Sequence, residues 1–475
     1  MNYRESDEPY AIGPKKGDMY IQQLYTNCLA EAAYYIESDH EAAIIDPLRE
    51  TEPYIELADE RGSKIKYVFE THFHADFVSG HIDLAKKVNA PIIYGPDAKT
   101  EYTVYNAKDG EEFTLGKVKI KVLHTPGHTP ESACYLLIDE NGKQHAIFTG
   151  DTLFVGDVGR PDLLDGLMSP EMLAGMMYDS LTEKIKTLPD DVIVYPAHGP
   201  GSACGKNIGK ETVSTIGEQK KFNYALKEMS REEFIEKITD GILPPPQYFF
   251  EDARINKTGY EPIEDVIREN TRPLSATQVK KFVNEGAVIL DTRSADDFEK
   301  GFIPGSVNIG LNGQFAVWVG TLIDISKKMV LITDPGKEQE TVLRLARVGY
   351  ENIVGYLDDP IGSYGHLDTV HSIEANEVSA EIEKGAVVLD VRKHGEWNIS
   401  HLKAAMFVPL TEFPGNLLQL DKHKTYIVHC GGGYRSMVAI SIMKNLGFED
   451  LINVQGGFGS MQKAGLEIVT EEVLL

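Results

Sequence analysis

Short apolar runs alternate with helical patterns in the C-terminal part of the chain. Residues 288–290 and 329–333 are two such runs, and a helical pattern follows over 340–348. Brief apolar runs with polar flanks are typical of buried strands. Strands that alternate with helices predict an α/β domain with a parallel sheet.

This order occurs twice. Residues 276–293 can be laid over 375–392 at a constant offset of 99 residues. The second copy has its own runs and helical pattern at 387–389, 426–429 and 436–446. A period near 100 residues is too long for a solenoid repeat. We therefore predict two copies of one small domain, over 270–368 and 370–475.

The first 265 residues show no such repeat and are expected to form a different domain, over 1–265. The boundary is placed in the polar segment 251–273, which holds Pro262 and Pro273. A chain of 475 residues has room for two to four domains.

The composition narrows the range of partners. Lys and Arg number 47 against 73 Asp and Glu, so the net charge is −26. Such a charge argues against nucleic acid and against an anionic membrane surface as partners. No apolar stretch is long enough for a membrane span, and residues 1–16 lack the apolar core of a signal peptide. The four cysteines form no CxxC pair, so we expect neither disulfides nor cysteine-built zinc sites, and a cytoplasmic location.

Histidine and aspartate gather in loops of the first domain. His72, His74 and Asp76 occupy alternate positions directly after the apolar run 65–69. Later loops, each beside Gly or Pro and each after another apolar run, carry His128, Asp151 and His198. Loops at strand ends are common places for binding sites, so this order predicts a metal site at a sheet rim.

These loops resemble the metallo-β-lactamase superfamily, whose hallmark is HxHxDH followed by further metal-binding His, Asp and His. The resemblance implies an αββα sandwich with the metal at one rim. One position departs from the hallmark, because Phe77 stands where the last His of the motif is expected. In two-metal members that His binds the second metal, and Phe has no lone pair to offer. We therefore expect a single metal.

Within the superfamily, the chain resembles the persulfide dioxygenase branch. The resemblance implies one Fe(II) per chain, bound by His72, His128 and Asp151. Two imidazoles and one carboxylate suit non-haem Fe(II). His74, Asp76 and His198 are then expected near the metal without binding it. The alternative is that one of these three is a ligand and that the metal is Zn.

Two further residues have competing interpretations. Arg160, on the Gly-rich segment 156–162, either holds a substrate carboxylate or forms a structural salt bridge. Cys204 lies six residues after His198 and either carries a sulfane sulfur or is a free thiol without function.

A second candidate site lies in the last domain. Cys430 ends an apolar run and is followed by Gly431, Gly432, Gly433, Tyr434, Arg435 and Ser436. Three glycines allow backbone N–H groups to form an anion-binding nest. The start of the following helix and Arg435 both favour a thiolate at Cys430.

This loop resembles the rhodanese family, whose cysteine carries a persulfide. Four residues separate Cys430 from Arg435, one fewer than in cysteine-based phosphatases, and the smaller ring suits a single sulfur atom. The resemblance implies that Cys430 and Arg435 are catalytic and that the residues between them, with Ser436, bind substrate. The first copy has Asp334 in place of the cysteine. We therefore expect it to be catalytically silent, as a spacer or an interface.

Along its whole length the chain resembles persulfide dioxygenase–rhodanese fusions. This implies that a low-molecular-weight thiol persulfide is oxidised with O2 to sulfite, and that sulfite then takes sulfur from Cys430 to give thiosulfate. Glutathione, coenzyme A and bacillithiol all remain open as the thiol, and a homo-oligomer is expected. Two alternatives remain, a glyoxalase II-like zinc thioester hydrolase fused to a sulfurtransferase and a non-catalytic persulfide sensor or scaffold.

Overall fold

The computed structural model describes residues 19–163, 168–413 and 415–470. The segment 1–16, in which no signal peptide is predicted, lies outside the described residues. The chain forms two compact units. One comprises Met1–Asp265 with Ala346–Gly349, and the other comprises Val266–Leu345 with Tyr350–Leu475.

The first unit contains two six-stranded sheets. One has the order β1 (Tyr20–Thr26), β2 (Glu31–Ser38), β3 (Glu41–Ile45), β4 (Lys64–Phe69), β5 (Ile92–Tyr94) and β6 (Tyr105–Asn106). The other has the order β12 (Ser214–Thr215), β11 (Ile193–Pro196), β10 (Gln144–Gly150), β9 (Ala133–Ile138), β8 (Val118–His124) and β7 (Glu112–Leu115).

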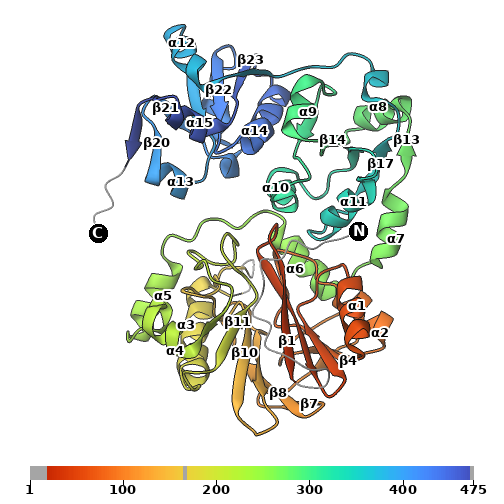
Figure 1. The fold of residues 1–475 in the computed structure, drawn as a ribbon, viewed down its shortest axis with the longest axis vertical. Helices are drawn as coiled ribbons and strands as arrows, with labels where there is room; N and C mark the ends of the chain where they lie inside the picture. The colour runs from red at the N-terminus through yellow and green to blue at the C-terminus, as the bar shows by residue number, and fades with distance from the viewer. Residues whose placement is uncertain (1–18, 164–167, 414, 471–475) are drawn as a thin grey trace. The chain divides into compact units, whose positions relative to one another are not determined.

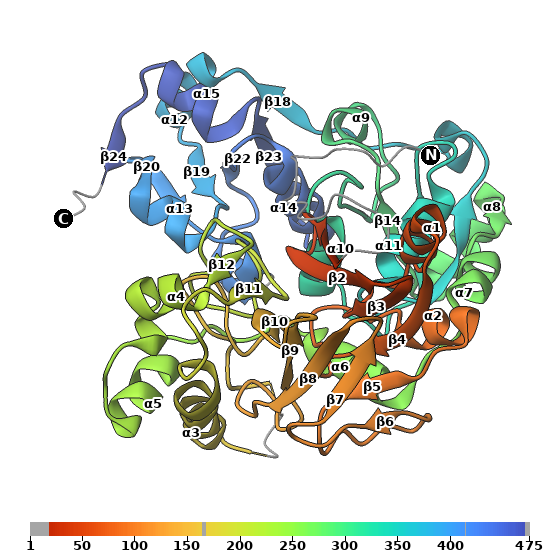
Figure 2. The same cartoon turned by 60° about the horizontal axis from the view of Figure 1, so that its bottom comes forward.

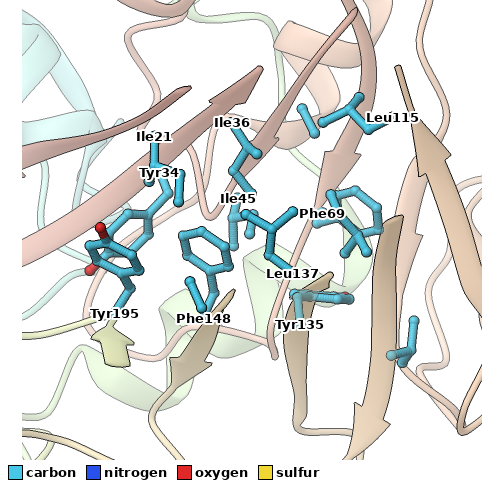
Figure 3. Close-up of a cluster of buried hydrophobic side chains, with 14 of the residues drawn as sticks. Ile21, Tyr34, Ile36, Ile45, Phe69, Leu115, Tyr135, Leu137, Phe148 and Tyr195 are labelled. Atoms are coloured by element: carbon cyan, nitrogen blue, oxygen red, sulfur yellow. The ribbon is translucent and has the colours of Figure 1, made fainter. Parts of the chain in front are cut away.

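The main core of this unit lies between the two sheets (Figure 3). Tyr34 from β2, Phe69 from β4 and Tyr135 from β9 belong to this cluster. Tyr35, which follows Tyr34 in β2, points to the opposite face of the first sheet, into a second apolar cluster. Side chains alternate between faces along a strand, so an entirely buried β2 supplies both clusters.

Helices cover the two outer faces (Figures 1 and 2). Helices α1 (Glu52–Arg61) and α2 (His81–Val88) pack on the first sheet. Helices α3 (Pro170–Ser180), α4 (Ile216–Phe222) and α5 (Arg231–Thr239) pack on the second. The predicted αββα sandwich is confirmed. The unit continues with α6 (Phe249–Thr258), and α7 (Ile263–Asn270) then leads into the second unit.

The second unit contains two five-stranded parallel sheets of the same topology. The first has the order β13 (Pro273–Leu274), β17 (Ile353–Leu357), β16 (Met329–Ile332), β14 (Val288–Asp291) and β15 (Ser306–Asn308). The second has the order β18 (His371–Ile373), β23 (Asp450–Val454), β22 (Thr425–His429), β19 (Val387–Asp390) and β21 (Ala405–Phe407). The predicted repeat of parallel α/β domains is confirmed.

Helices accompany each of these sheets. The first copy has α8 (Ala276–Asn284), α9 (Ala295–Lys300), α10 (Phe315–Leu322) and α11 (Glu338–Ala346). The second has α12 (Val378–Glu383), α13 (His394–Ile399), α14 (Tyr434–Asn445) and α15 (Gly457–Lys463). The second copy also has a short antiparallel strand pair, β20 (Ser400–Leu402) and β24 (Ile468–Thr470). Both α11 and α14 begin two residues earlier than the sequence pattern predicts.

The repeated Asp-x-Arg of the two copies is a structural feature. Arg293 binds Asp291 and the carbonyl of Gly301, and Arg392 makes the same contacts with Asp390 and Ser400. Each pair ties the end of its strand, β14 or β19, to the segment that follows the next helix. Within the described part of the chain, no helix is both long and apolar enough to cross a membrane.

Candidate metal centre and sulfur-transfer site

Strand direction explains why the His and Asp loops meet. His128 follows β8, Asp151 follows β10 and His198 follows β11. Strands β8 and β10 both run antiparallel to β9, and β10 is parallel to β11, so the three loops leave the same edge of the sheet. The loop after β4 of the facing sheet brings His72 to the same place.

The ligand atoms of His72, His128 and Asp151 lie within 4.8 Å of one another. His128 Nε2 is 3.4 Å from Asp151 Oδ2, and His72 Nε2 is 3.9 Å from the same atom. All three side chains are buried, and these Nε2 atoms and both Asp151 oxygens have no hydrogen-bond partner. Buried polar atoms without partners are costly, and one cation would satisfy all of them. The donor set therefore fits a bound divalent metal.

Polar contacts behind the ring nitrogens orient both histidines. His72 Nδ1 is 2.9 Å from Thr71 Oγ1, which donates to Asp46 Oδ2 at 2.8 Å. His128 Nδ1 donates to the carbonyl oxygen of Arg160 at 2.8 Å. Such contacts fix the tautomer and leave Nε2 free for a metal. Burial and the neighbouring histidines hold the pKa of His72 well below 6.5, so its imidazole is neutral.

Gly159 lets the loop after Asp151 pack closely against two of the predicted ligands, Asp151 and His128. A Cβ at this position would lie 2.3 Å from the Asp151 carbonyl oxygen and 2.9 Å from His128 Nδ1. The sequence singled out this loop for Arg160 alone. Gly159 also contacts the ligands, because its N–H donates to the Asp151 carbonyl oxygen at 3.0 Å, and it has no side chain to signal this role.

A second group of donors adjoins the first. His74, Asp76 and His198 also offer ligand atoms within 4.8 Å of one another. His198 Nε2 lies 3.4 Å from Asp76 Oδ2 and 3.5 Å from Asp151 Oδ1. Phe77 is fully buried, and its ring lies against that of His74 with centroids 4.3 Å apart. The structure thus brings all six predicted residues together, with an apolar ring beside the second group.

Three acidic or amide groups near this site were not found from the sequence. Asp46 Oδ1 lies 3.1 Å from His74 Nε2, and Glu70 Oε2 lies 3.7 Å from it. Burial, and then the Asp46 carboxylate, raise the pKa of Glu70 well above 4.5. Asn256 of α6 donates to the carbonyl oxygens of His74 and Phe77. Asp46 and Glu70 each follow a buried strand, β3 and β4, which is the signal that could have identified them.

Arg160 and Cys204 both lie close to the metal centre. Arg160 is 7% exposed and binds Asp162 through two hydrogen bonds of 2.7 and 2.8 Å. It also donates to the carbonyl oxygens of Ala203 and Leu243. The pair with Asp162 is the kind of contact that the interpretation of Arg160 as part of a structural salt bridge predicts. The Cys204 sulfur lies within 4.8 Å of ligand atoms of Asp151 and His198, and burial raises the pKa of its thiol well above 9.0.

The Cys430 loop lies between β22 and α14. The backbone N–H of Gly433 donates to Cys430 Sγ at 3.1 Å. Gly433 has φ +107°, a left-handed conformation that favours glycine. Ser436 Oγ lies 3.8 Å from the sulfur and donates to Asn453 Oδ1 at 2.8 Å. The sulfur therefore lies at the N-terminus of α14, in a loop that places an N–H group on it.

Glu396 of α13 is a partner of this loop that the sequence did not reveal. Its carboxylate pairs with the Arg435 guanidinium in two hydrogen bonds, one of 2.8 Å. Nothing in the local pattern signals this, because Glu396 lies 39 residues from Arg435. In the first copy the corresponding loop carries Asp334, which is exposed.

The comparisons with known proteins agree with this arrangement. The model of the metallo-beta-lactamase superfamily matches residues 26–198, and that of the rhodanese-like domain matches residues 275–362 and 374–464. The chain belongs to the metallo-β-lactamase superfamily, and two rhodanese-like domains follow the superfamily domain.

Individual proteins similar to this chain indicate the branch of the superfamily more closely. "Persulfide dioxygenase ETHE1, mitochondrial" of Homo sapiens is 33% identical over 241 residues, which cover 50% of this chain and 86% of that protein. The hydroxyacylglutathione hydrolase of Dictyostelium discoideum is 35% identical over 185 residues, covering 38% and 66%. A crystal structure of a metallo-beta-lactamase from Staphylococcus aureus subsp. aureus COL superposes with a TM-score of 0.63 at 34% identity, covering 71% of this chain and 98% of that one. The predicted combination of domains is confirmed.

Proposed function

We propose that the chain is a non-haem Fe(II) persulfide dioxygenase coupled to a sulfurtransferase. The observation that carries the proposal is the buried group of His72, His128 and Asp151, whose ligand atoms have no other partner. Phe77 beside His74 argues for one metal instead of two. Similarity to a persulfide dioxygenase over half of the chain supports the same reaction class.

The first reaction converts a thiol persulfide, O2 and water into the free thiol and sulfite. Held by His72, His128 and Asp151, Fe(II) would supply the redox chemistry that O2 requires. The two imidazoles and the carboxylate would hold the cation in place. Asp76 and His198, 3.4 Å apart, are placed to hold a proton between them.

The second reaction takes place at Cys430. A persulfide transfers its outer sulfur to the Cys430 thiolate, and the free thiol leaves. Sulfite then attacks the outer sulfur of the Cys430 persulfide, the S–S bond breaks, and thiosulfate and the thiolate result. The Gly433 N–H and the N-terminus of α14 stabilise negative charge on the sulfur. The first rhodanese copy, with Asp334 in this position, is silent in the reaction.

A zinc thioester hydrolase is the second candidate. The similarity to hydroxyacylglutathione hydrolases and the second group of donors, His74, Asp76 and His198, favour it. Phe77 disfavours it. For either reaction we place the protein in the cytoplasm, because its four cysteines are all free thiols.

Metal analysis on protein purified without oxygen, together with O2 uptake, separates the two candidates. We expect about one iron per chain and O2 uptake that depends on an added thiol persulfide. His128→Ala should lose both, whereas His423→Ala, at an exposed site in the last domain, should keep them. About two zinc ions per chain without O2 uptake would contradict the proposal and favour the hydrolase.

A further inference from the structure

Tyr434 of the cysteine loop in the active copy contacts the silent rhodanese copy. Tyr434 is the last of the four residues between Cys430 and Arg435. Its hydroxyl donates to the carbonyl oxygen of Gly310 at 2.8 Å. Gly310 lies just after β15 of the first copy, so this bond joins the two copies at the catalytic loop.

Gly310 and Gly313 of the first copy lie next to the Tyr434 ring, and we call this surface the seat of Tyr434. A Cβ on Gly310 would lie 3.3 Å from Tyr434 Cε2, and a Cβ on Gly313 would lie 4.0 Å from it. A side chain on Gly310 would press on the ring, whereas the Gly313 position stands at ordinary van der Waals distance. The seat is held by the first copy's own sheet, because Leu311 N–H donates to the Thr292 carbonyl oxygen and Arg344 of α11 donates to the Leu311 carbonyl oxygen.

Gly432 and Gly433 of the catalytic loop have no comparable support. A Cβ on Gly432 or Gly433 would meet no atom within 4 Å, so this part of the loop is not packed. Glycine has the largest conformational freedom to lose, so holding such a loop in one conformation needs a fixed point nearby. Tyr434 directly follows Gly433, whose N–H contacts Cys430 Sγ, and directly precedes Arg435.

Both copies also line the space around this residue. A cavity of about 470 Å³ lies between Ala295–Lys300 of α9 and Gly432 and Gly433. A second, of about 420 Å³, is lined by Gln314 and Trp318 from the first copy and by Arg435. Tyr434 lines both. Figure 1 shows α14, which begins at Tyr434, beside α9 of the first copy.

We propose that the silent copy is a positioning part of the sulfur-transfer site. Tyr434, seated on Gly310, holds the loop so that the Gly433 N–H and Arg435 face the sulfur of Cys430. This rests on the proposed function, and it gives the silent copy a role in catalysis although it contributes no nucleophile. Tyr434 is a positioning residue, since it acts through its neighbours in the loop.

Tyr434→Phe tests the seat by removing one hydroxyl. The first readout is the pH at which alkylation of Cys430 by iodoacetamide reaches half its maximal rate, followed by mass spectrometry of the Cys430 peptide. A loosened loop donates less well to the thiolate, so this pH should rise by about 0.5 to 1. Thiosulfate formation from sulfite and a thiol persulfide should fall about tenfold in kcat. Tyr426→Phe, a buried tyrosine of β22 outside the loop, is the control and should resemble wild type in both.

A second variant acts from the other copy. Gly310→Ala presses on the Tyr434 ring and should shift alkylation in the same direction, whereas Gly362→Ala, at an open position of the first copy, should not. If the two residues act as one unit, the double variant Tyr434→Phe/Gly310→Ala should be no worse than the stronger single variant. Wild-type alkylation profiles in both single variants, or effects that multiply in the double variant, would overturn the proposal.

The proposed function and the positioning role of Tyr434 are tested by different measurements. If wild-type protein forms no thiosulfate, the proposed function fails, but the alkylation profiles still decide whether Tyr434 positions the loop. If Tyr434→Phe does not fold, Gly310→Ala and its control give the same decision.

Discussion

Phe77 is the residue from which we infer a single metal ion per chain. Its fully buried ring lies against His74, in the part of the site where a second metal would need another ligand. Phe77→His replaces that ring with an imidazole of similar size. We expect reconstituted protein to bind about two metal ions per chain instead of about one, as measured by mass spectrometry of the metals.

The matched control is Phe73→His, in the same loop. Phe73 packs against Tyr94 instead, with ring centroids 5.0 Å apart, so the new imidazole should leave the metal content unchanged. A Phe77→His protein that still binds one metal would show that another feature keeps the second position empty.

His429, next to Cys430, predicts a pH dependence of stability. Burial lowers the pKa of this imidazole from 6.5 to about 4. Between these values the unfolded chain binds a proton that the folded chain does not, so stability is fully present above about pH 6.5 and falls as the pH is lowered towards 4. The loss amounts to about 3 kcal/mol.

His429→Gln should therefore flatten the fall in the unfolding temperature of the rhodanese unit between about pH 7 and pH 5. His423→Gln is the control. His423 is exposed, and its pKa is raised by Glu449, so its small contribution has the opposite sign. Equal slopes in His429→Gln and wild type would refute this assignment of the acid sensitivity.

At the scale of elements, the loops that follow strands form the metal site. Gly159 is the point at which the loop after Asp151 packs against the loop that carries His128. A methyl group there would displace the Asp151 backbone or the His128 ring. We expect Gly159→Ala to weaken iron binding about 10- to 100-fold, as measured by titration of the metal-free protein.

Gly156→Ala separates contact from backbone strain. Gly156 lies in the same loop with φ +77°, but a Cβ there would meet no atom within 4 Å. This variant should lose some stability and keep its iron affinity. If both variants lose iron equally, loop strain and not contact with the ligands is the cause.

The elements themselves follow from the sequence, except at their ends. The apolar runs identify β4, β14, β16, β19 and β22. Helix α14 begins at Tyr434, two residues before the predicted start, because the left-handed Gly433 turns the chain directly into the helix. The helical pattern shows apolar residues only from Met437 onward, so it could not locate the first turn.

At the scale of the whole molecule, we propose two reactions in one chain, and a mutation should be able to abolish one and leave the other. Cys430→Ser removes the sulfur carrier and leaves the metal site intact. We expect O2 uptake to persist while sulfite accumulates and thiosulfate falls to background, as measured by chromatography of the sulfur products. In the proposed reaction, joining the two sites in one chain would raise the local concentration of sulfite at Cys430.

Cys28→Ser, at the partly buried cysteine of the first unit, is the control and should form thiosulfate like wild type. An equal loss of O2 uptake in Cys430→Ser would mean that the two reactions are not separable steps.

Residues close together in the chain could be identified from the sequence alone. The alternating His72, His74 and Asp76, the departure at Phe77, the loop from Cys430 to Arg435 and the duplicated domain are all local or periodic patterns. Strand and helix periodicity act over a few residues, so the printed sequence carries them.

Contacts between distant segments required the folded chain. Asp46 reaches Thr71 and the histidines because β3 and β4 pair in parallel, and Tyr434 meets Gly310 across 124 residues. Glycine carries no side-chain signal, so neither Gly159 beside His128 nor Gly310 beneath Tyr434 could be recognised before the fold had brought these segments together.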